Sequence, residues 1–378
     1  MQRRQLQGFL PLRQFFFGVF LLAVAGCSTL PLESTKIPHP SSRGGPDLPS
    51  GYQEAVGVIH VHTSYSDGSL PLDAVAKIAN AQDLDYLIIT DHNTLQGRRD
   101  GKEGFHGKTL VLVDEEISTK GGHYVAMRLS TEVPRLQDPR WTIEAVSIQG
   151  GLGFIAHPFW PRRPWKDQDV RGITGLEIYN EVQDVTEENP LWLGFWTIFA
   201  GSEFSLMEWL DRPSPSLALW DRMLAHGDRV VGIGSTDAHG LRRFGLRLGP
   251  YTTMFRLVRT HLLVHRLSKE AVYEALAGGH AFVAHDLVAD AKGFTFLAVH
   301  RNSVDGIMGD RIKKRPDLRL YTYLPSPGLI MLLKDGQAVG QVEGQHGWFN
   351  VSGPGVYRVE ATRKGKPWIY SNPIYVIE

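Results

Sequence analysis

The chain has 378 residues, 42% of them hydrophobic, which is enough for one large domain and a smaller one. Its 40 Lys and Arg residues balance 40 Asp and Glu residues, so no basic excess indicates a long-lived nucleic-acid partner. A single nucleotide or a short oligomer stays open as a substrate. The only cysteine, Cys27, excludes an internal disulfide.

The first 26 residues have the pattern of an export signal. Three arginines lie within the first 13 residues, and the apolar run 15–25 is too short for a comfortable membrane span. The run ends in Val24-Ala25-Gly26-Cys27, which resembles a bacterial lipobox, whose cysteine is acylated and anchors the protein. A plain signal peptide or an anchor helix is the alternative. Because Ser28 follows, the resemblance implies a lipid-anchored protein of the outer membrane that faces the periplasm.

Residues 27–54 are rich in Pro, Ser and Gly and lack apolar periodicity, so we expect a flexible tether. Strand-like apolar runs then recur at 56–59, 86–89, 110–113, 153–156 and 230–234. Each run is followed by His, Asp or Glu, in chain order His60 and His62, Asp91 and His92, Glu115 and Glu116, His157, and Asp237 and His239. A parallel α/β barrel places its active site at these strand ends. Helical periodicity is present at 71–82, between the first two runs, and at 269–278, after the last one. The stretch 280–284 is expected to be the last barrel strand.

His60 and His62 lie two residues apart in a strand-like stretch, so both rings point to the same side and could clamp one metal ion. Taken alone, this pair is better explained by two histidines at a barrel mouth that are held by hydrogen bonds. The same alternation separates Glu115 from Glu116, because neighbouring side chains in a strand point to opposite sides. Only one of these two carboxylates can therefore face the site.

The ordered motifs resemble those of the PHP (polymerase and histidinol phosphatase) superfamily: His60-x-His62, Ser66-Asp67-Gly68, Thr90-Asp91-His92, Glu116-Ile117-Ser118, Gly122-His123, His157-Pro158 and Asp237-Ala238-His239. The resemblance implies an α/β fold, a distorted (β/α)7 barrel over residues 55–287. It also implies an enzyme with two or three divalent metal ions that hydrolyses phosphoesters. Mixed imidazole and carboxylate ligands suit Zn, Mn or Fe without choosing among them.

The resemblance assigns the ligands to three ions. It implies one ion held by His60, His62, Glu116 and Asp237, a second held by Glu116, His123 and His157, and a third held by Asp67, His92 and His239. Glu116 would bridge the first two, Glu115 would not ligate, and Asp91 would orient an imidazole. Hydroxide generated by the ions would attack a small phosphorylated substrate, with catalytic roles for Glu116, Asp237 and His239. His239 or a water would protonate the leaving group.

Three further stretches bear on the substrate. Arg242 and Arg243 are expected to contact phosphate oxygens, because guanidinium groups bind them in bidentate fashion, although a surface pair is an equal alternative. Arg98, Arg99 and Lys102 lie in an expected polar loop, 97–107. Such a loop could cover the site and bring these cations to an anionic substrate, although an ordinary solvated loop is the simpler interpretation. The insert 181–227 is rich in Trp and Phe. We expect helices that pack these rings on the barrel, with a lid or a membrane-contacting patch as alternatives.

Residues 288–378 have strand-like runs at 294–299, 318–324, 330–334, 348–351, 355–362 and 373–377, which predict a small β-sandwich that caps the barrel. Asp335-Gly336 predicts a hairpin turn. The tail 368–375 is similar to a branch of metallohydrolases that includes carbaryl hydrolase. A carboxylic or carbamic ester hydrolase with the same metal centre is therefore the alternative function, and a tethered, inactive binding protein is a further one.

Replacing Cys27 with Ala should release the protein from the membrane fraction, because the only acylation site is lost. Fractionation and labelling with a radioactive fatty acid measure this. The lipoprotein interpretation fails if the variant partitions like the wild type and neither form carries the label.

Overall fold

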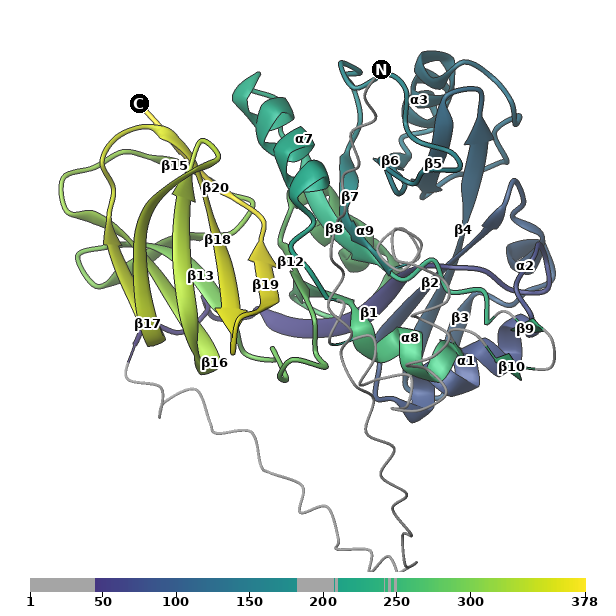
Figure 1. Ribbon diagram of the computed structural model, residues 1–378, viewed down its shortest axis with the longest axis horizontal. Coiled ribbons are helices and arrows are strands. Elements are labelled where there is room, and N and C mark those ends of the chain that lie inside the picture. Colours follow the sequence, from purple (N-terminus) through teal and green to yellow (C-terminus); the bar gives the residue numbers. More distant parts are fainter. Residues whose placement is uncertain (1–44, 182–206, 208–209, 241, 244–245, 248–249) are drawn as a thin grey trace, which may run out of the picture. The chain divides into compact units, whose positions relative to one another are not determined.

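The structure is a computed structural model that describes residues 45–181, 207, 210–240, 242–243, 246–247 and 250–378. These residues form a mixed α/β fold in which strands predominate (Figure 1). Within these ranges, none of the helices has the length and apolar character needed to cross a bilayer. The export signal, Cys27 and most of the aromatic insert lie outside the described residues, so their roles stay predictions.

The first part of the fold is a series of strands joined edge to edge, namely β1 (Gln53–Val61), β2 (Tyr86–His92), β4 (Thr109–Thr119), β5 (Gly122–Met127), β6 (Leu152–Ile155), β7 (Gly175–Asn180) and β8 (Val231–Ser235). Only β5 runs antiparallel to its two neighbours. A parallel bridge between Val61 and Ala238 joins the last strand's end to the first. The carboxyl ends of the parallel strands therefore meet on one side.

The buried runs form strands because both faces of the series are covered. Ile59, Ile88 and Leu112 belong to one apolar cluster, whereas their neighbours Leu87 and Val111 belong to another. Alternate side chains thus enter different cores, as expected for parallel strands buried on both faces. This explains why these segments read as continuous apolar runs in the sequence.

Helices cover the outside of this series. The predicted helices are confirmed as α1 (Leu72–Ala81) and α9 (Lys269–Gly278). Ser268 caps α9 at its start, and Gly279 ends it with a φ of 70° that favours glycine. The other helices are α2 (Gln96–Arg99), α3 (Pro139–Ile148), α7 (Ser214–Ala225) and α8 (Tyr251–Leu257).

The expectation of a polar loop over 97–107 is wrong. This stretch contains part of α2 and the strand β3 (Gly104–His106), which pairs antiparallel with β4. Arg98 donates to the carbonyl oxygens of Val113 and Leu129 and contacts Asp114 at 3.1 Å. Arg98 therefore joins α2 to β4 and to the segment after β5 instead of meeting a substrate. Similarly, Lys102 pairs with Asp73 at 2.6 Å.

The segment after α8 also departs from expectation. The strand β11 (Arg259–Val264) was not predicted, and it pairs antiparallel with β1. The strand β12 (Ala281–Ala284), expected to be the last barrel strand, instead pairs antiparallel with β11 and β19. These two strands extend the sheet from β1 toward the C-terminal strands.

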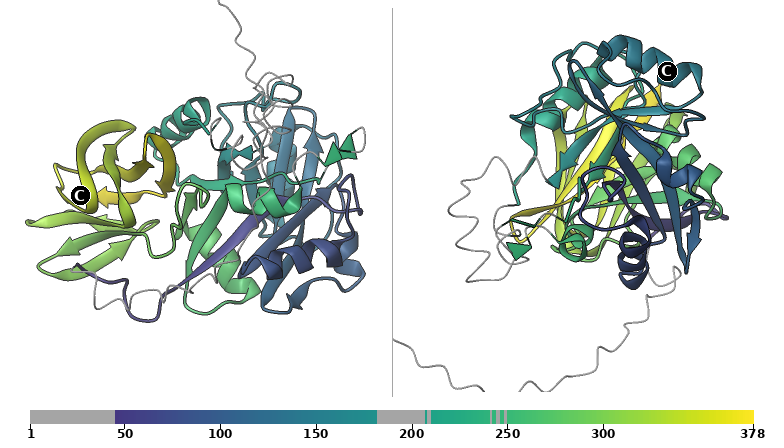
Figure 2. Two further views of the ribbon diagram at one scale, coloured as in Figure 1. Left: turned by 60° about the horizontal axis from the view of Figure 1, so that its bottom comes forward. Right: turned by 90° about the vertical axis from the view of Figure 1, so that its right-hand side faces the viewer.

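The C-terminal strands are β13 (Thr295–His300), β14 (Ser303–Ile307), β15 (Arg311–Lys313), β16 (Leu318–Lys334), β17 (Gln337–Asn350), β18 (Gly355–Arg363), β19 (Lys366–Ser371) and β20 (Ile374–Ile377), and Figure 2 shows them gathered together. The predicted runs 318–324 and 330–334 are one strand, β16, whose register shifts between Tyr323 and Gly328. The predicted turn is present, since Asp335 and Gly336 have φ values of 49° and 77°. β14, β15 and β19 were not predicted.

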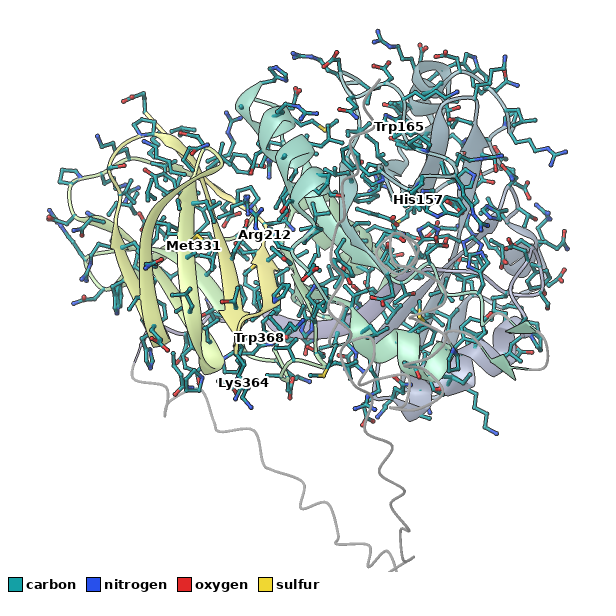
Figure 3. All side chains as sticks on the ribbon, in the orientation of Figure 1. His157, Trp165, Arg212, Met331, Lys364 and Trp368 are labelled. Atoms are coloured by element: carbon teal, nitrogen blue, oxygen red, sulfur yellow. The ribbon has the colours of Figure 1, made fainter. Side chains whose placement is uncertain are left out.

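Buried polar contacts tie the C-terminal strands to β8, β12 and α7. Asn372 accepts from the backbone N of Gly232 at 2.8 Å and donates to the carbonyl oxygens of Gly232 and Ala281, each at 2.9 Å. Arg358 of β18 is buried and binds Asp221 of α7 through two nitrogens, at 2.9 and 2.8 Å. Arg212, labelled in Figure 3, pairs with Glu360 in the same way.

A buried ion cluster joins β1, β11 and the segment after β12. His261 Nδ1 lies 2.5 Å from Glu54 Oε1, and His261 Nε2 lies 3.5 Å from Asp286 Oδ1. Burial alone would lower the pKa of His261, but the two carboxylates outweigh it and raise the pKa from 6.5 to about 9. The charged imidazolium is therefore the form that the fold stabilises.

This raised pKa predicts a pH-dependent stability. Because His261 binds its proton more tightly in the folded chain, its contribution is fully present below pH 6.5 and is lost as the pH rises through about 9. The free energy of unfolding should fall over this window by on the order of 3 kcal/mol more in the wild type than in His261→Gln. Denaturant unfolding at a series of pH values measures this, and equal slopes in both proteins would contradict it.

Candidate metal centre

The strands bring the nine predicted ligand positions together at one side of the series. His60 lies in β1 and His62 follows it, His92 ends β2, His157 follows β6, and Asp237 and His239 follow β8. Two positions depart from the expected strand ends. Glu116 lies inside β4, and His123 is the second residue of β5. Since β5 is antiparallel, its beginning lies beside the carboxyl ends of its neighbours, which explains why His123 reaches the same side.

The most buried group consists of His60, His62, Glu116 and Asp237. Glu116 Oε2 lies 3.3 Å from both His60 Nε2 and His62 Nε2. Asp237 Oδ1 lies 3.4 Å from His60 Nε2 and 3.2 Å from His62 Nε2. Ligands held at about 2.1 Å around a tetrahedral ion are separated by roughly 3.4 Å, so these four contacts match the edges of such a site.

Unpartnered polar atoms support this fit. Among the described residues, His60 Nε2, His62 Nε2 and Glu116 Oε2 are buried and have no hydrogen-bond partner. Buried polar atoms are rarely left without a partner, because the cost is about 1–3 kcal/mol each. Three such atoms converging within a few ångströms are explained if they are ligands of one cation.

The other oxygen of Glu116 faces a second group. Glu116 Oε1 lies 2.7 Å from His123 Nδ1 and 3.0 Å from His157 Nε2, and His157 is labelled in Figure 3. The two rings approach each other to 3.3 Å between His123 Nδ1 and His157 Nε2. Each carboxylate oxygen of Glu116 thus faces a different set of imidazoles, as a bridging carboxylate would.

The third group is more open. Asp67 Oδ1 lies 3.3 Å from His239 Nε2, and Asp67 Oδ2 lies 3.6 Å from His92 Nε2. The Asp67 side chain is 54% exposed, whereas Glu116 is 1% exposed. His62 takes part here too, since its Nδ1 lies 3.6 Å from Asp67 Oδ1. The centre is therefore open to solvent on the side of Asp67.

Backbone strain accompanies three of these residues. His60, His157 and Asp237 have φ values of 64°, 28° and 50°, which side chains other than glycine rarely adopt. The register of β1 against β2 shifts between Val58 and Val61, around His60. Such strain costs about 1–3 kcal/mol per residue and is typical of sites whose geometry serves function.

The charges of the site stabilise one another. Burial alone would raise the pKa of Glu116, but His60, His123 and His157 hold it well below 4.5. Burial alone would lower the pKa of His239, but Asp67 and Asp237 raise it to about 9. Glu116 and Asp237 therefore stay ionised near neutral pH.

Glu115 points away from this centre, as strand alternation predicts. It is buried and accepts from the backbone N of Val133 at 2.8 Å. It belongs to none of the three ligand groups described above. Burial, with the nearby Glu132 and Asp114, raises its pKa to about 7. It therefore provides a matched control for Glu116 on the same strand.

Asp91 does not orient an imidazole in the way we expected. Its carboxylate accepts from Thr63 N at 2.7 Å, from Thr63 Oγ1 at 2.6 Å and from Ser66 Oγ at 2.6 Å. It thus fixes the loop between His62 and Asp67. The contact with an imidazole is indirect, through Ser66 Oγ, which lies 3.4 Å from His62 Nδ1.

Two contacts beside the centre were not predicted from the sequence. Arg163 Nη1 lies 3.0 Å from His123 Nε2, and Glu177 Oε1 lies 2.5 Å from His60 Nδ1. The pair Arg162-Arg163, shortly after His157-Pro158, is the same signal that singled out Arg242 and Arg243. The backbone of Arg242 and Arg243 forms β9 (Arg242–Arg243), paired with β10 (Leu246–Arg247), and their side chains lie outside the described part of the structure.

Comparisons with known proteins give one sequence relative. No family model matches the chain. The uncharacterized protein MJ1587 from Methanocaldococcus jannaschii is 31% identical over 142 residues, which cover 32% of this chain and 80% of that protein.

Solved structures give weaker likenesses. A two-domain protein from Bacteroides vulgatus, which contains a predicted PHP-like metal-dependent phosphoesterase, is 16% identical and covers 87% of this chain and 97% of its own, with a TM-score of 0.44. The lesion-specific endonuclease PfuEndoQ from Pyrococcus furiosus is 14% identical and covers 60% of this chain and 56% of its own, with a TM-score of 0.41. Both TM-scores are below 0.5, so the chemistry of the site rests on its own residues.

Because Glu115 and Glu116 have different surroundings, replacing each with glutamine should affect metal binding differently. Glu116→Gln should lower metal content and affinity by more than about 10–100-fold, which is the typical effect of losing only an outer supporting contact. Glu115→Gln should keep the wild-type stoichiometry, because an amide oxygen can still accept from Val133 N. Equilibrium dialysis with Zn or Mn and metal analysis measure both, and equal losses would contradict the assignment.

Proposed function

We propose that this chain, which belongs to the same family as the uncharacterized protein MJ1587 from Methanocaldococcus jannaschii, is a metal-dependent phosphoesterase of the PHP superfamily. The observation that carries the proposal is the position of Glu116. Its two oxygens lie within 3.3 Å of nitrogens from five histidines: His60, His62, His92, His123 and His157. A carboxylate between two sets of imidazoles is the arrangement expected for neighbouring divalent cations.

The strand pairings support the barrel fold that we expect for a PHP phosphoesterase. We assign the series β1–β2–β4–β5–β6–β7–β8 to a distorted (β/α)7 barrel, in which the inverted β5 is the distortion. The parallel bridge between Val61 and Ala238 is consistent with its closure. The antiparallel strands after β12 would form the C-terminal sandwich. The proposed domains are the signal 1–26, the tether 27–54, the barrel 55–287 with its insert, and 288–378.

The residues of the centre would hold two or three divalent ions, Zn, Mn or Fe. The first ion would take His60, His62, Glu116 and Asp237, and a second would share Glu116 with His123 and His157. Asp67, His92 and His239 would hold a third. Bound divalent cations supply Lewis acidity, which polarises phosphoryl oxygens and makes water a nucleophile near neutral pH.

The chain's own groups would position and protonate the substrate. Arg163 lies at the centre's edge, next to His123, where its guanidinium could bind two phosphoryl oxygens. His239 lies on the open side and can hold a proton at Nε2, because Asp67 Oδ1 is 3.3 Å away. With two ions bound, it is therefore the proposed donor to the leaving group, whereas with a third ion held by His239 Nε2 a water would take this role. Arg242 and Arg243 remain proposed contacts for the substrate.

The lipid anchor at Cys27 would place this activity at the cell envelope, on the periplasmic side of the outer membrane. A small phosphorylated molecule is the proposed substrate.

A paired assay tests the reaction class. The purified full chain in detergent, supplied with Mn or Zn, should hydrolyse bis-p-nitrophenyl phosphate or p-nitrophenyl phosphate, and chelation should abolish the activity. Phosphoester hydrolysis is so slow without a catalyst that weak turnover above a metal-only control is informative. p-Nitrophenyl acetate and an aryl carbamate serve as the competing substrates. If only these carboxyl esters are hydrolysed, the phosphoesterase proposal is wrong and the ester-hydrolase alternative replaces it.

A further inference from the structure

Glu177 is a buried carboxylate of β7 that faces the metal centre from behind, and none of the candidate ion-holding groups of the described residues includes it. Its Oε1 lies 2.5 Å from His60 Nδ1. Its Oε2 accepts from the backbone N of His157 at 2.7 Å and from Asn180 Nδ2 at 2.8 Å. The two oxygens of one side chain therefore contact a histidine from each side of Glu116.

The contact with His60 selects one form of the ring. A carboxylate accepts hydrogen bonds and does not donate them, so the hydrogen of a neutral His60 ring belongs on Nδ1. The lone pair then lies on Nε2, which faces Glu116 Oε2 at 3.3 Å and Asp237 Oδ1 at 3.4 Å. Only this tautomer can act as a ligand in the first group, because a protonated Nε2 has no lone pair to give.

The contact with His157 fixes its backbone. His157 has a φ of 28°, a conformation that a side chain other than glycine adopts only when its surroundings impose it. The bond from His157 N to Glu177 Oε2 is one such constraint, and it directs the ring so that its Nε2 lies 3.0 Å from Glu116 Oε1. His157 belongs to the second group, on the other oxygen of Glu116.

We propose that Glu177 is a positioning residue that assembles both metal subsites together, by setting the tautomer of His60 and the backbone of His157. The inference rests on the metal centre of the proposed function, and it adds a physical link between the two ions. Loss of the carboxylate should weaken both subsites, although Glu177 touches neither ion.

Glu177→Gln tests this because glutamine has nearly the same shape but only one accepting oxygen. If the amide oxygen keeps the contacts with His157 N and Asn180, the amide NH2 faces His60 Nδ1. His60 Nδ1 must then accept, and its hydrogen moves to Nε2, where it blocks ligation. If the amide is turned the other way, His157 N loses its acceptor. Either orientation damages one subsite directly and the other through Glu116.

The first readout needs no metal and no activity. Long-range ¹⁵N NMR of the metal-free full chain reports the tautomer of each histidine, and the His60 signal is assigned by its loss in His60→Gln. Burial alone would lower the pKa of His60, but the carboxylates around it hold the pKa well above 6.5, so the spectra are recorded at a pH high enough to leave the ring neutral. In the wild type we then expect the hydrogen of His60 on Nδ1. Finding it on Nε2 overturns the proposal, whatever the enzyme does.

The second readout is the affinity for Zn or Mn, measured by titration calorimetry. Glu177→Gln should lose about 10–100-fold in affinity for both ions, the usual effect of removing a residue that supports a ligand. Glu115→Gln, the matched control, should bind like the wild type, and wild-type binding by Glu177→Gln overturns the proposal. If Glu177→Gln does not fold, Glu177→Asp decides, since it keeps both accepting oxygens. It should retain the Nδ1 tautomer and an intermediate affinity, and loss of that tautomer overturns the proposal.

These outcomes separate this inference from the proposed reaction. If the tautomer and the coupled metal affinities are found but no phosphoester is hydrolysed, the reaction class is wrong and the role of Glu177 stands. If phosphoesters are hydrolysed while Glu177→Gln binds both ions normally, the role of Glu177 is wrong and the reaction class stands.

Discussion

The structure depends on one buried charge, the carboxylate of Glu116. At 1% exposure it is shielded from water, and an uncompensated carboxylate there would be strongly destabilising. Five imidazoles from the ends of four strands surround it instead, and their contacts hold its pKa well below 4.5 in spite of burial. The strand series therefore has to bring β1, β2, β4, β5 and β6 to one place with little freedom of register.

That demand is met at a cost in backbone strain, which a surrounding layer of hydrogen bonds offsets. Glu177 holds His60 and His157, and Thr236 Oγ1 donates to the carbonyl oxygen of His60 at 3.2 Å. Tyr251 Oη lies 2.8 Å and 2.9 Å from the carbonyl oxygens of His62 and His239. Three of these five contacts join residues more than 100 positions apart in the sequence. The site is consequently preorganised by the fold rather than by its own local turns.

This distinction explains what the sequence could predict. Strand-end residues such as His92 and His157 were found because an apolar run followed by a ligand-type residue is a local signal, and strand alternation separated Glu116 from Glu115. The contact between Glu177 and His60 was not predictable in this way. The two residues are 117 positions apart, and the contact depends on how distant strands are placed. Arg98 was misassigned for the same reason. Its charge is visible in the sequence, but the carbonyl oxygens of Val113 and Leu129 that use it are not. β11 was not predicted, and β12 was taken for the last barrel strand, because the pairing of these strands with β1 and β19 is set by tertiary packing.

The C-terminal strands gain a role from the same reasoning. Asn372 binds the backbone of Gly232 in β8 and of Ala281 in β12, and Arg358 binds Asp221 of α7, which packs on β7. β7 carries Glu177, and β8 leads directly to Asp237 and His239. The polar contacts of the C-terminal part therefore reach β8 directly and β7 through α7. The placement of these two strands sets the ring of His60 and the carboxylate of Asp237. A region without a His and carboxylate cluster of its own can in this way determine the geometry of a centre that lies in another part of the fold.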